Sequence, residues 1–190
     1  MKIIALNGSP RKNGNTKILI DTVLKPLTDA GAQTKIIQLG ASGIKPCIAC
    51  GGCIKQKNRK CVVEDVLNTF IEDIWAADAL IIGSPTYFAN ATAEVRSFVD
   101  RVGYVGRANG GLLKRKVGVA IAVMRRAGAM TVLDSINKLF FISDMYSVGS
   151  SYWNIAFGRE KREVVDDEEG MKTMINLGEN ILYLLRQLKK

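Results

Sequence analysis

The sequence predicts an α/β fold: a doubly wound parallel sheet of five strands with helices on both faces. Short apolar runs alternate with longer segments whose apolar residues repeat at helical spacing. The run at 79–82 is apolar throughout, as a strand covered on both faces requires. Glycine, proline, asparagine and arginine gather in the loops after the first, third and fourth strands, where such sheets bind ligands.

The individual elements follow from these patterns. The predicted strands lie at residues 2–6, 34–39, 79–82, 117–123 and 146–148. The predicted helices lie at 17–30, 66–77, about 95–102, 130–142 and 174–188. Pro26 should bend or shorten the first helix, and Gly31 should end it. The segment at 40–64 is irregular and contains all four cysteines.

Length, charge and cysteine content limit the possible functions. A chain of 190 residues is expected to form a single domain over 1–190. The net charge of +9 suggests anionic partners, but lysines and arginines are mixed with acids, so we expect no nucleic acid. No apolar run is long enough for a membrane, and the chain opens directly into a strand, so we expect a cytoplasmic location. Four cysteines there are more often thiols, metal ligands or redox centres than disulfides.

The loop at 8–16 has the composition of an anion site. A helix follows it, and the free N–H groups and the dipole of a first helical turn favour negative charge. Gly8 and Gly14 let the backbone approach an anion closely. Further donors are Ser9, Asn13, Asn15 and Thr16. The Walker A and Gly-x-Gly-x-x-Gly fingerprints are both absent, and phosphate binding is favoured over an ordinary capped turn.

The loop after the third strand predicts a wall for a flat heteroaromatic ring. Its residues offer a rigid turn, a hydroxyl and two aromatic side chains: Pro85, Thr86, Tyr87 and Phe88. Alone, the aromatic residues would simply pack on the next helix. Combined with a phosphate loop on a neighbouring strand, they predict a mononucleotide site.

The cysteines form a compact group of thiols in a chain without histidine. Cys47, Cys50, Cys53 and Cys61 are separated by two, two and seven residues. Four thiolates are what a [4Fe–4S] cluster needs, and two-residue spacers let one loop reach three of its corners. Four free thiols and a four-sulfur zinc site remain the alternatives. Basic residues at 55–60 either offset the charge of a cluster, dock an acidic protein, or form a solvated loop.

Several motifs resemble those of the flavodoxin-like NAD(P)H-dependent FMN reductases. They are Asn7-Gly8-Ser9-Pro10 with Asn15-Thr16, Gly83-Ser84-Pro85-Thr86-Tyr87, Asp100-Arg101 and Arg125-Arg126-Ala127-Gly128. The resemblance covers residues 1 to about 155, and the cysteine spacing is similar to that of the iron–sulfur flavoprotein branch. It implies a flavodoxin-like sheet with strand order 2-1-3-4-5.

The resemblance also implies a cofactor site. Residues 9–16 would hold the FMN phosphate, 85–88 would contact the isoalloxazine ring, and 125–128 would flank its other edge. Arg11 and Arg126 could each reach a phosphate of FMN or of NAD(P)H. The expected FMN-binding residues are Ser9, Arg11, Asn13, Asn15, Thr16, Pro85, Thr86, Tyr87, Phe88, Arg125, Arg126 and Gly128. The expected cluster ligands are Cys47, Cys50, Cys53 and Cys61.

The function implied is that of an FMN-dependent oxidoreductase. It would transfer electrons between a [4Fe–4S] cluster or NAD(P)H and a small-molecule or protein acceptor, with a ferredoxin-like protein as a further possible donor. No protein acid or base is needed, because the flavin carries the redox chemistry. The alternatives are a cluster-free NAD(P)H-dependent FMN or quinone reductase, a flavodoxin-type electron carrier, and a zinc-stabilised binding module. The aromatic loop at 150–157 leads us to expect a homodimer or homotetramer.

Overall fold

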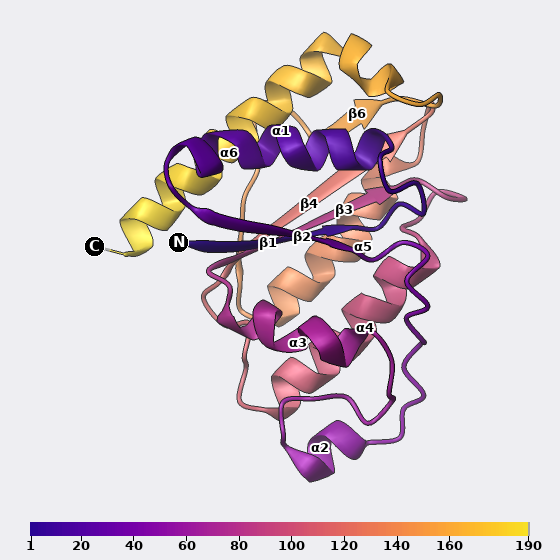
Figure 1. Ribbon diagram of the computed structural model, residues 1–190, viewed down its shortest axis with the longest axis vertical. Coiled ribbons are helices and arrows are strands. Elements are labelled where there is room, and N and C mark those ends of the chain that lie inside the picture. Colours follow the sequence, from indigo (N-terminus) through magenta and orange to yellow (C-terminus); the bar gives the residue numbers. More distant parts are fainter. Residues whose placement is uncertain (190) are drawn as a thin grey trace.

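A parallel β-sheet forms the centre of the molecule (Figure 1). The computed structural model describes residues 1–189. Its strand order, β2-β1-β3-β4-β5, confirms the predicted doubly wound, flavodoxin-like sheet. The strands are β1 (Lys2–Asn7), β2 (Gln33–Gln38), β3 (Ala79–Pro85), β4 (Val117–Met124), β5 (Tyr146–Ser147) and β6 (Ile155–Phe157).

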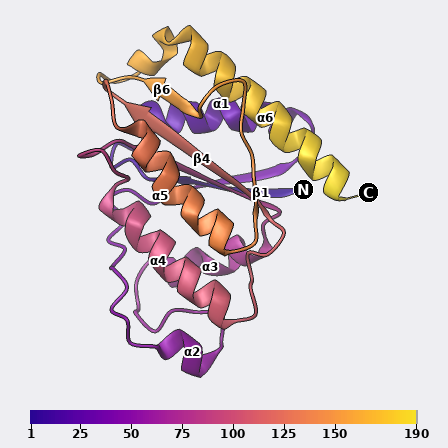
Figure 2. The same cartoon turned by 180° about the vertical axis from the view of Figure 1, so that it is seen from behind.

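Helices cover both faces of this sheet, as Figures 1 and 2 show from opposite sides. The helices are α1 (Asn15–Asp29), α2 (Gly52–Gln56), α3 (Leu67–Ala76), α4 (Ala93–Ala108), α5 (Ala129–Ile142) and α6 (Glu168–Leu188), with a 3₁₀ turn, η1 (Glu163–Asp166). One face carries α1 and α6, and the other carries α3, α4 and α5. No described helix combines the length and apolar character needed to cross a membrane.

Alternation along the strands divides the core between the two faces. Ile3 and Ala5 of β1 pack in the cluster under α1 and α6, whereas Ile4 and Leu6 pack in the cluster under α3, α4 and α5. All four side chains are fully buried. Successive strand residues point to opposite faces, so a continuous apolar run is what a sheet covered on both sides requires.

The fifth strand position is divided between two segments. β5 pairs with the start of β4, and β6 pairs with its end. The predicted strand at 146–148 therefore covers only the first part of this edge, and the sequence analysis missed β6. Asn154 bridges the gap, because its Nδ2 donates to the carbonyls of Ala120 (3.1 Å) and Val148 (3.2 Å). A three-residue strand next to a polar loop is too short to show a period.

Two helix boundaries also differ from the sequence-based expectation. α1 begins at Asn15, before the predicted 17, and runs through Pro26 to Asp29, so the proline does not shorten it, and a bend there stays a prediction. Gly31 does end it as predicted: its φ is 81° and its N–H donates to the Thr28 carbonyl at 2.9 Å. α6 begins at Glu168, well before the predicted 174, because Asp167 caps its polar first turn by accepting from the Gly170 N–H at 3.0 Å.

Candidate functional site

Loops from three neighbouring strands meet at one cavity at the carboxyl ends of β1, β3 and β4. We call it the FMN-site cavity because the sequence analysis expects FMN at these loops. It is lined by Ser9, Arg11, Asn15, Thr16, Pro85, Thr86, Tyr87, Val123, Arg125, Gly158 and Arg159. It lies where doubly wound sheets place their ligands. The three loops that the sequence analysis singled out are thus brought together.

The loop after β1 is held against β3 by its own backbone. The N–H of Gly8 donates to the Gly83 carbonyl at 2.8 Å, and a Cβ on Gly8 would lie 2.3 Å from Val95 Cγ2. A side chain at position 8 therefore has no room. Ser9 Oγ accepts from the Arg11 N–H at 3.1 Å, which curls the loop toward the start of α1 at Asn15. The free N–H groups of that first turn suit an anion.

Two buried oxygen atoms in the FMN-site cavity lack a hydrogen-bond partner among the described residues. They are Asn15 Oδ1 and Thr86 Oγ1. The Asn15 side chain is held in place, since its Nδ2 donates to the Glu160 carbonyl at 2.8 Å. Buried polar atoms are rarely left unpaired in folded proteins. Because both unpaired atoms belong to residues of the same cavity, they favour a ligand with polar groups at those positions.

The structure distributes the predicted FMN-site residues unevenly. Eight of them line the cavity, whereas Asn13, Phe88, Arg126 and Gly128 are not among the lining residues. Phe88 is fully exposed, at 108% of its reference surface. Gly128 instead has φ 89° and contacts the neighbouring turn, because a Cβ there would lie 3.0 Å from Ala89. Direct ligand contacts for these four residues stay predictions.

The turn at 87–90 has an unusual backbone. Tyr87 and Asn90 exchange both backbone hydrogen bonds, at 2.9 and 3.0 Å, and the two residues between them have positive φ: 47° at Phe88 and 56° at Ala89. Such two-residue turns favour glycine and asparagine, because other side chains are strained there. The turn projects Phe88 into solvent beside the FMN-site cavity.

Sequence reasoning missed residues that approach the cavity from elsewhere in the chain. Gly158 and Arg159 line it, and the Arg159 carbonyl accepts from Arg11 Nη1 at 3.1 Å. Gly40, after β2, supports it from behind, since a Cβ there would lie 2.2 Å from the Ser9 carbonyl carbon. The glycine at 40 was visible, but nothing local in the sequence shows what it approaches.

A second cavity is lined by all four cysteines together with residues of α4. The α4 residues are Arg101, Tyr104 and Val105. No group of three His, Cys, Asp or Glu side chains within residues 1–189 is placed to hold a single metal ion. Burial raises the pKa of the Cys53 thiol above its ordinary value. We call this the cysteine cavity.

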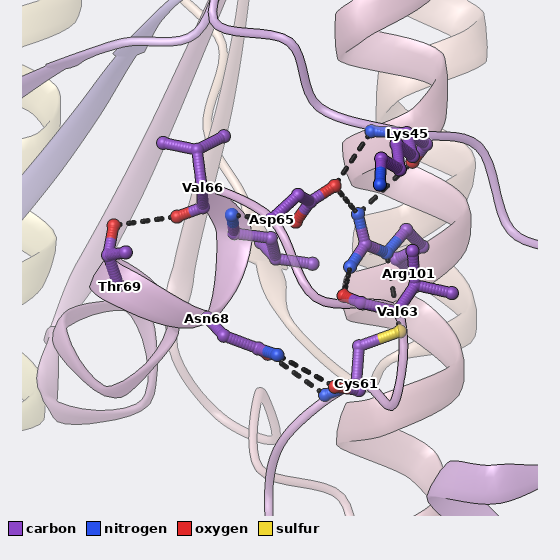
Figure 3. Close-up of polar contacts among 9 residues, drawn as sticks. Lys45, Cys61, Val63, Asp65, Val66, Asn68, Thr69 and Arg101 are labelled. Atoms are coloured by element: carbon purple, nitrogen blue, oxygen red, sulfur yellow. Dashed lines mark hydrogen bonds and ion pairs between the residues drawn. The ribbon is translucent and has the colours of Figure 1, made fainter.

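Cys61 is held more firmly than a loop position requires (Figure 3). Its N–H donates to Asn68 Oδ1 at 3.0 Å, and its carbonyl accepts from Asn68 Nδ2 at 2.7 Å. Its sulfur accepts from Arg101 Nε at 3.3 Å. One residue of α3 therefore fixes the backbone of Cys61, and one residue of α4 contacts its thiol.

Arg101 and Asp65 form a buried ion pair. Their further hydrogen bonds join Lys45 to Val63, the two ends of the segment that contains all four cysteines. Arg101 Nη1 donates to the Lys45 carbonyl at 3.1 Å, and Nη2 donates to the Val63 carbonyl at 2.7 Å. Asp65 Oδ2 accepts from the Lys45 N–H at 2.8 Å. Burial alone would raise the pKa of Asp65, but the hydrogen bonds from Arg101 and from backbone N–H groups hold it below its ordinary value.

Comparison with known proteins identifies the family. The family model for NADPH-dependent FMN reductases matches residues 1–160. The chain belongs to this family. It is an FMN-dependent oxidoreductase, as the sequence analysis predicted.

Several relatives of the chain carry the same name. An iron–sulfur flavoprotein from Methanocaldococcus jannaschii is 32% identical over 202 residues and covers 100% of both chains. An iron–sulfur flavoprotein from Methanosarcina thermophila is 30% identical, over 100% of this chain and 98% of the relative. The predicted resemblance to the iron–sulfur flavoprotein branch is thereby confirmed.

Solved structures of low sequence identity share the fold. A WrbA-like flavodoxin from Agrobacterium tumefaciens superposes with a TM-score of 0.68 at 16% identity, over 98% of this chain and 96% of that one. A flavone reductase gives 0.72 at 18% identity, over 100% of this chain and 64% of that one. These similarities confirm the flavodoxin-like architecture.

The family supports FMN as the cofactor, and the residues of the FMN-site cavity fit it. The first turn of α1 and Arg11 offer donors for a phosphate. Asn15 Oδ1 and the Thr86 hydroxyl are buried atoms that still need a partner, and Tyr87 adds an aromatic surface. This set matches a ligand with an anionic end, hydroxyl groups and a flat ring.

Proposed function

We propose that the protein passes electrons from NAD(P)H or a ferredoxin-like carrier to a small-molecule or protein acceptor through FMN. A [4Fe–4S] cluster on Cys47, Cys50, Cys53 and Cys61 serves as a second redox centre. The observation that carries this proposal is that four cysteines from one short segment line a single cavity in an FMN reductase chain. The names of its relatives point the same way.

FMN supplies hydride and single-electron transfer when bound, so the protein residues act by binding and orientation. In this proposal the phosphate lies against 9–16, where Arg11 is a charged donor that lines the cavity. Thr86 and Tyr87 orient the ring, and the 125–128 loop limits access from the opposite edge. No side chain is required to take up or release a proton.

Basic side chains near the cysteine cavity support a cluster over four free thiols. A cubane with four thiolates is net anionic, so nearby cations reduce the cost of holding it. Arg101 is buried, and it donates to the Cys61 sulfur while its charge is shared with Asp65. Further cations are exposed between Cys53 and Cys61: Lys55 in α2, and Lys57 and Lys60 after it. Reduced thiols are also what a cytoplasmic location, which we include in the proposal, would maintain.

The test is an absorption spectrum of protein purified without oxygen, with iron and acid-labile sulfide measured on the same sample. We expect a flavin spectrum on a broad shoulder and about four irons per chain. The matched control is Cys50→Ser, which removes an exposed ligand and should lose the cluster while keeping the flavin. A flavin spectrum without iron would remove the cluster from the proposal, and colourless protein that does not take up FMN would overturn it entirely.

A cluster-free NAD(P)H-dependent quinone reductase is the second candidate. A relative from Acidithiobacillus ferrooxidans named NAD(P)H dehydrogenase (quinone) is 34% identical over 83 residues, 43% of this chain. Fast reduction of the bound flavin by NADPH in iron-free protein, with quinone turnover, would favour it. No turnover with pyridine nucleotides would instead favour a flavodoxin-type electron carrier.

We also propose that the chain assembles as a homodimer or homotetramer. Tyr152 and Trp153 support this, because both lie more than half exposed in the loop between β5 and β6. Exposed aromatic side chains are enriched at protein interfaces. Analytical ultracentrifugation of the FMN-loaded protein tests it, and a monomer at micromolar concentration would contradict it.

A further inference from the structure

We infer that Arg101 is a positioning residue for the fourth cysteine: it holds the Cys61 sulfur in place and raises the reduction potential of a cluster bound there. The inference rests on the proposed cluster. It concerns how one buried side chain of α4 acts on one ligand atom, which the proposed function leaves open. The contacts in Figure 3 carry it.

Cys61 is held in place by protein contacts alone, without a cluster. Only two residues separate Cys47 from Cys50 and Cys50 from Cys53, whereas seven residues separate Cys53 from Cys61. A free spacer of that length would leave the fourth thiol without a defined position. Asn68 fixes the Cys61 backbone and Arg101 contacts its sulfur, so the thiol is held at the wall of the cysteine cavity.

The N–H donors of Arg101 bind two different groups of acceptors. Nη1 and Nη2 bind Asp65 and the carbonyls of Lys45 and Val63, which closes the segment. Nε points instead to Cys61. The guanidinium is planar and rigid, so the first task sets the direction of Nε–H. A lysine has no second donor in that geometry, although it can keep the ion pair.

The hydrogen bond from Arg101 to Cys61 should also change the reduction potential of a cluster bound there. Arg101 is buried, and because Asp65 pairs with it and offsets its charge, it acts on the cluster mainly through the Nε–H group that donates to the Cys61 sulfur. Reduction makes a cluster more negative, and a hydrogen bond or a nearby cation stabilises the more negative state. Hydrogen bonds to cysteine sulfur are among the features that set cluster potentials. Arg101 should therefore make the cluster easier to reduce.

The test compares reduction potentials of FMN- and cluster-loaded protein by spectroelectrochemical titration, with the cluster signal followed by electron paramagnetic resonance. Arg101→Lys keeps the charge and removes the Nε–H donor. We expect the ratio of reduced to oxidised cluster to fall up to about tenfold at a given ambient potential, which is about 59 mV for a one-electron couple. The FMN potential of the same sample is the internal reference.

A second variant allows for misfolding of the first. The double variant D65N/R101Q also conserves net charge, and it removes both members of the buried pair, which is often tolerated better than removing one. We expect the same downward shift. Loss of the cluster from both variants, with FMN content and far-UV circular dichroism unchanged, would equally support a role in holding Cys61.

The matched control is Arg107→Gln, which removes one charge from the same helix. Arg107 is exposed, and its side chain makes no hydrogen bond or ion pair among the described residues. Its effect on the potential should be much smaller than that of Arg101→Lys. A cluster in the wild type with equal potentials in all variants would overturn this inference alone. A wild type that binds no cluster would overturn both this inference and the proposed cluster.

Discussion

At the scale of single residues, we expect the Thr86 hydroxyl and the missing side chain of Gly40 to affect FMN binding. The Thr86 hydroxyl is buried without a partner in the FMN-site cavity. Gly40 lies where any side chain would collide with the backbone of the phosphate loop. The unpaired Thr86 hydroxyl therefore destabilises the FMN-free protein. The missing side chain of Gly40 lets the backbone after β2 lie close to the phosphate loop. Substitution of either residue should weaken FMN binding, but only that of Thr86 should also stabilise the FMN-free protein.

Thr86→Val should stabilise the FMN-free protein and weaken FMN binding. Valine has the same shape without the unpaired hydroxyl, so the free energy of unfolding should rise by about 1 kcal/mol. The lost hydrogen bond to the ligand should raise the Kd for FMN about tenfold. Urea unfolding and flavin fluorescence titration measure the two effects. Thr22→Val is the control, because that hydroxyl already donates to the Ile18 carbonyl at 2.9 Å and should give no stabilisation.

Gly40→Ala should reduce FMN affinity without contacting FMN. The added Cβ would lie 2.2 Å from the carbonyl group of Ser9, so the phosphate loop must shift. We expect at least a tenfold loss of affinity, or about 1.4 kcal/mol, in the same titration. Gly149→Ala is the matched control, since a Cβ there meets nothing within 4 Å. Equal affinity in both variants would show that Gly40 does not position the loop.

At the scale of elements, apolar runs predict β1, β3 and β4 well because these strands are buried on both faces. β6 escapes this reasoning, since three residues beside a polar loop carry no period. The sequence analysis therefore also missed Gly158 and Arg159, which follow β6 and line the FMN-site cavity. The role of Gly40 was missed for another reason, and Arg101 was named only as part of a motif, without its contact to Cys61: both residues act across long sequence separations, Gly40 on Ser9 and Arg101 on Cys61. Local patterns cannot show such contacts.

Asp73 ties α3 to the first two strands. Its carboxylate accepts from Lys2 Nζ at 2.8 Å and from Lys35 Nζ at 2.6 Å. These hydrogen bonds, that from Lys2 first, hold the pKa of Asp73 below its ordinary value. A lowered folded-state pKa gives stability that is present above the unfolded pKa and lost as the pH falls through the folded one.

Asp73→Asn should therefore lower stability at neutral pH and have progressively less effect in acid. We expect a decrease of about 1 kcal/mol or less at pH 7, because both pairs are partly exposed. The difference should shrink as the pH falls below about 4, where the unfolded carboxyl takes up its proton. Denaturant unfolding across this range tests it. Asp134→Asn, in an exposed pair with Lys138, should change little at any pH.

At the scale of the molecule, the FMN-site cavity joins segments that are remote in sequence. It draws on the chain near residue 10, on the ends of β3 and β4, and on the segment after β6. The start of α1, from the layer that also holds α6, forms one side of it. A ligand bound there contacts several elements at once and should stabilise the fold as a unit.

FMN should therefore raise the unfolding temperature in a concentration-dependent way. At free FMN one hundred times its Kd, the gain is about 2.7 kcal/mol. Differential scanning calorimetry of stripped protein at increasing FMN measures it. Riboflavin is the matched ligand, since it lacks the phosphate that the 9–16 loop should hold, and it should give a smaller shift at equal concentration. An unfolding temperature independent of FMN would contradict the assignment of the cavity.

Arg101 joins the two ends of the segment from Lys45 to Val63, which contains all four cysteines, and this limits which parts of the segment can change in length. Lys45 and Val63 lie at the two ends of the segment, and both are held by the same guanidinium. The residues between them form a closed loop outside the sheet (Figure 1). Doubling the length of a flexible loop costs only about 0.6 kcal/mol. We expect insertions or deletions between Cys53 and Arg59 to be tolerated, whereas Arg59, which Asn109 and Trp75 hold, and the ion pair of Arg101 with Asp65 should be retained. The length of this segment could then change without a change in the reductase fold that carries it.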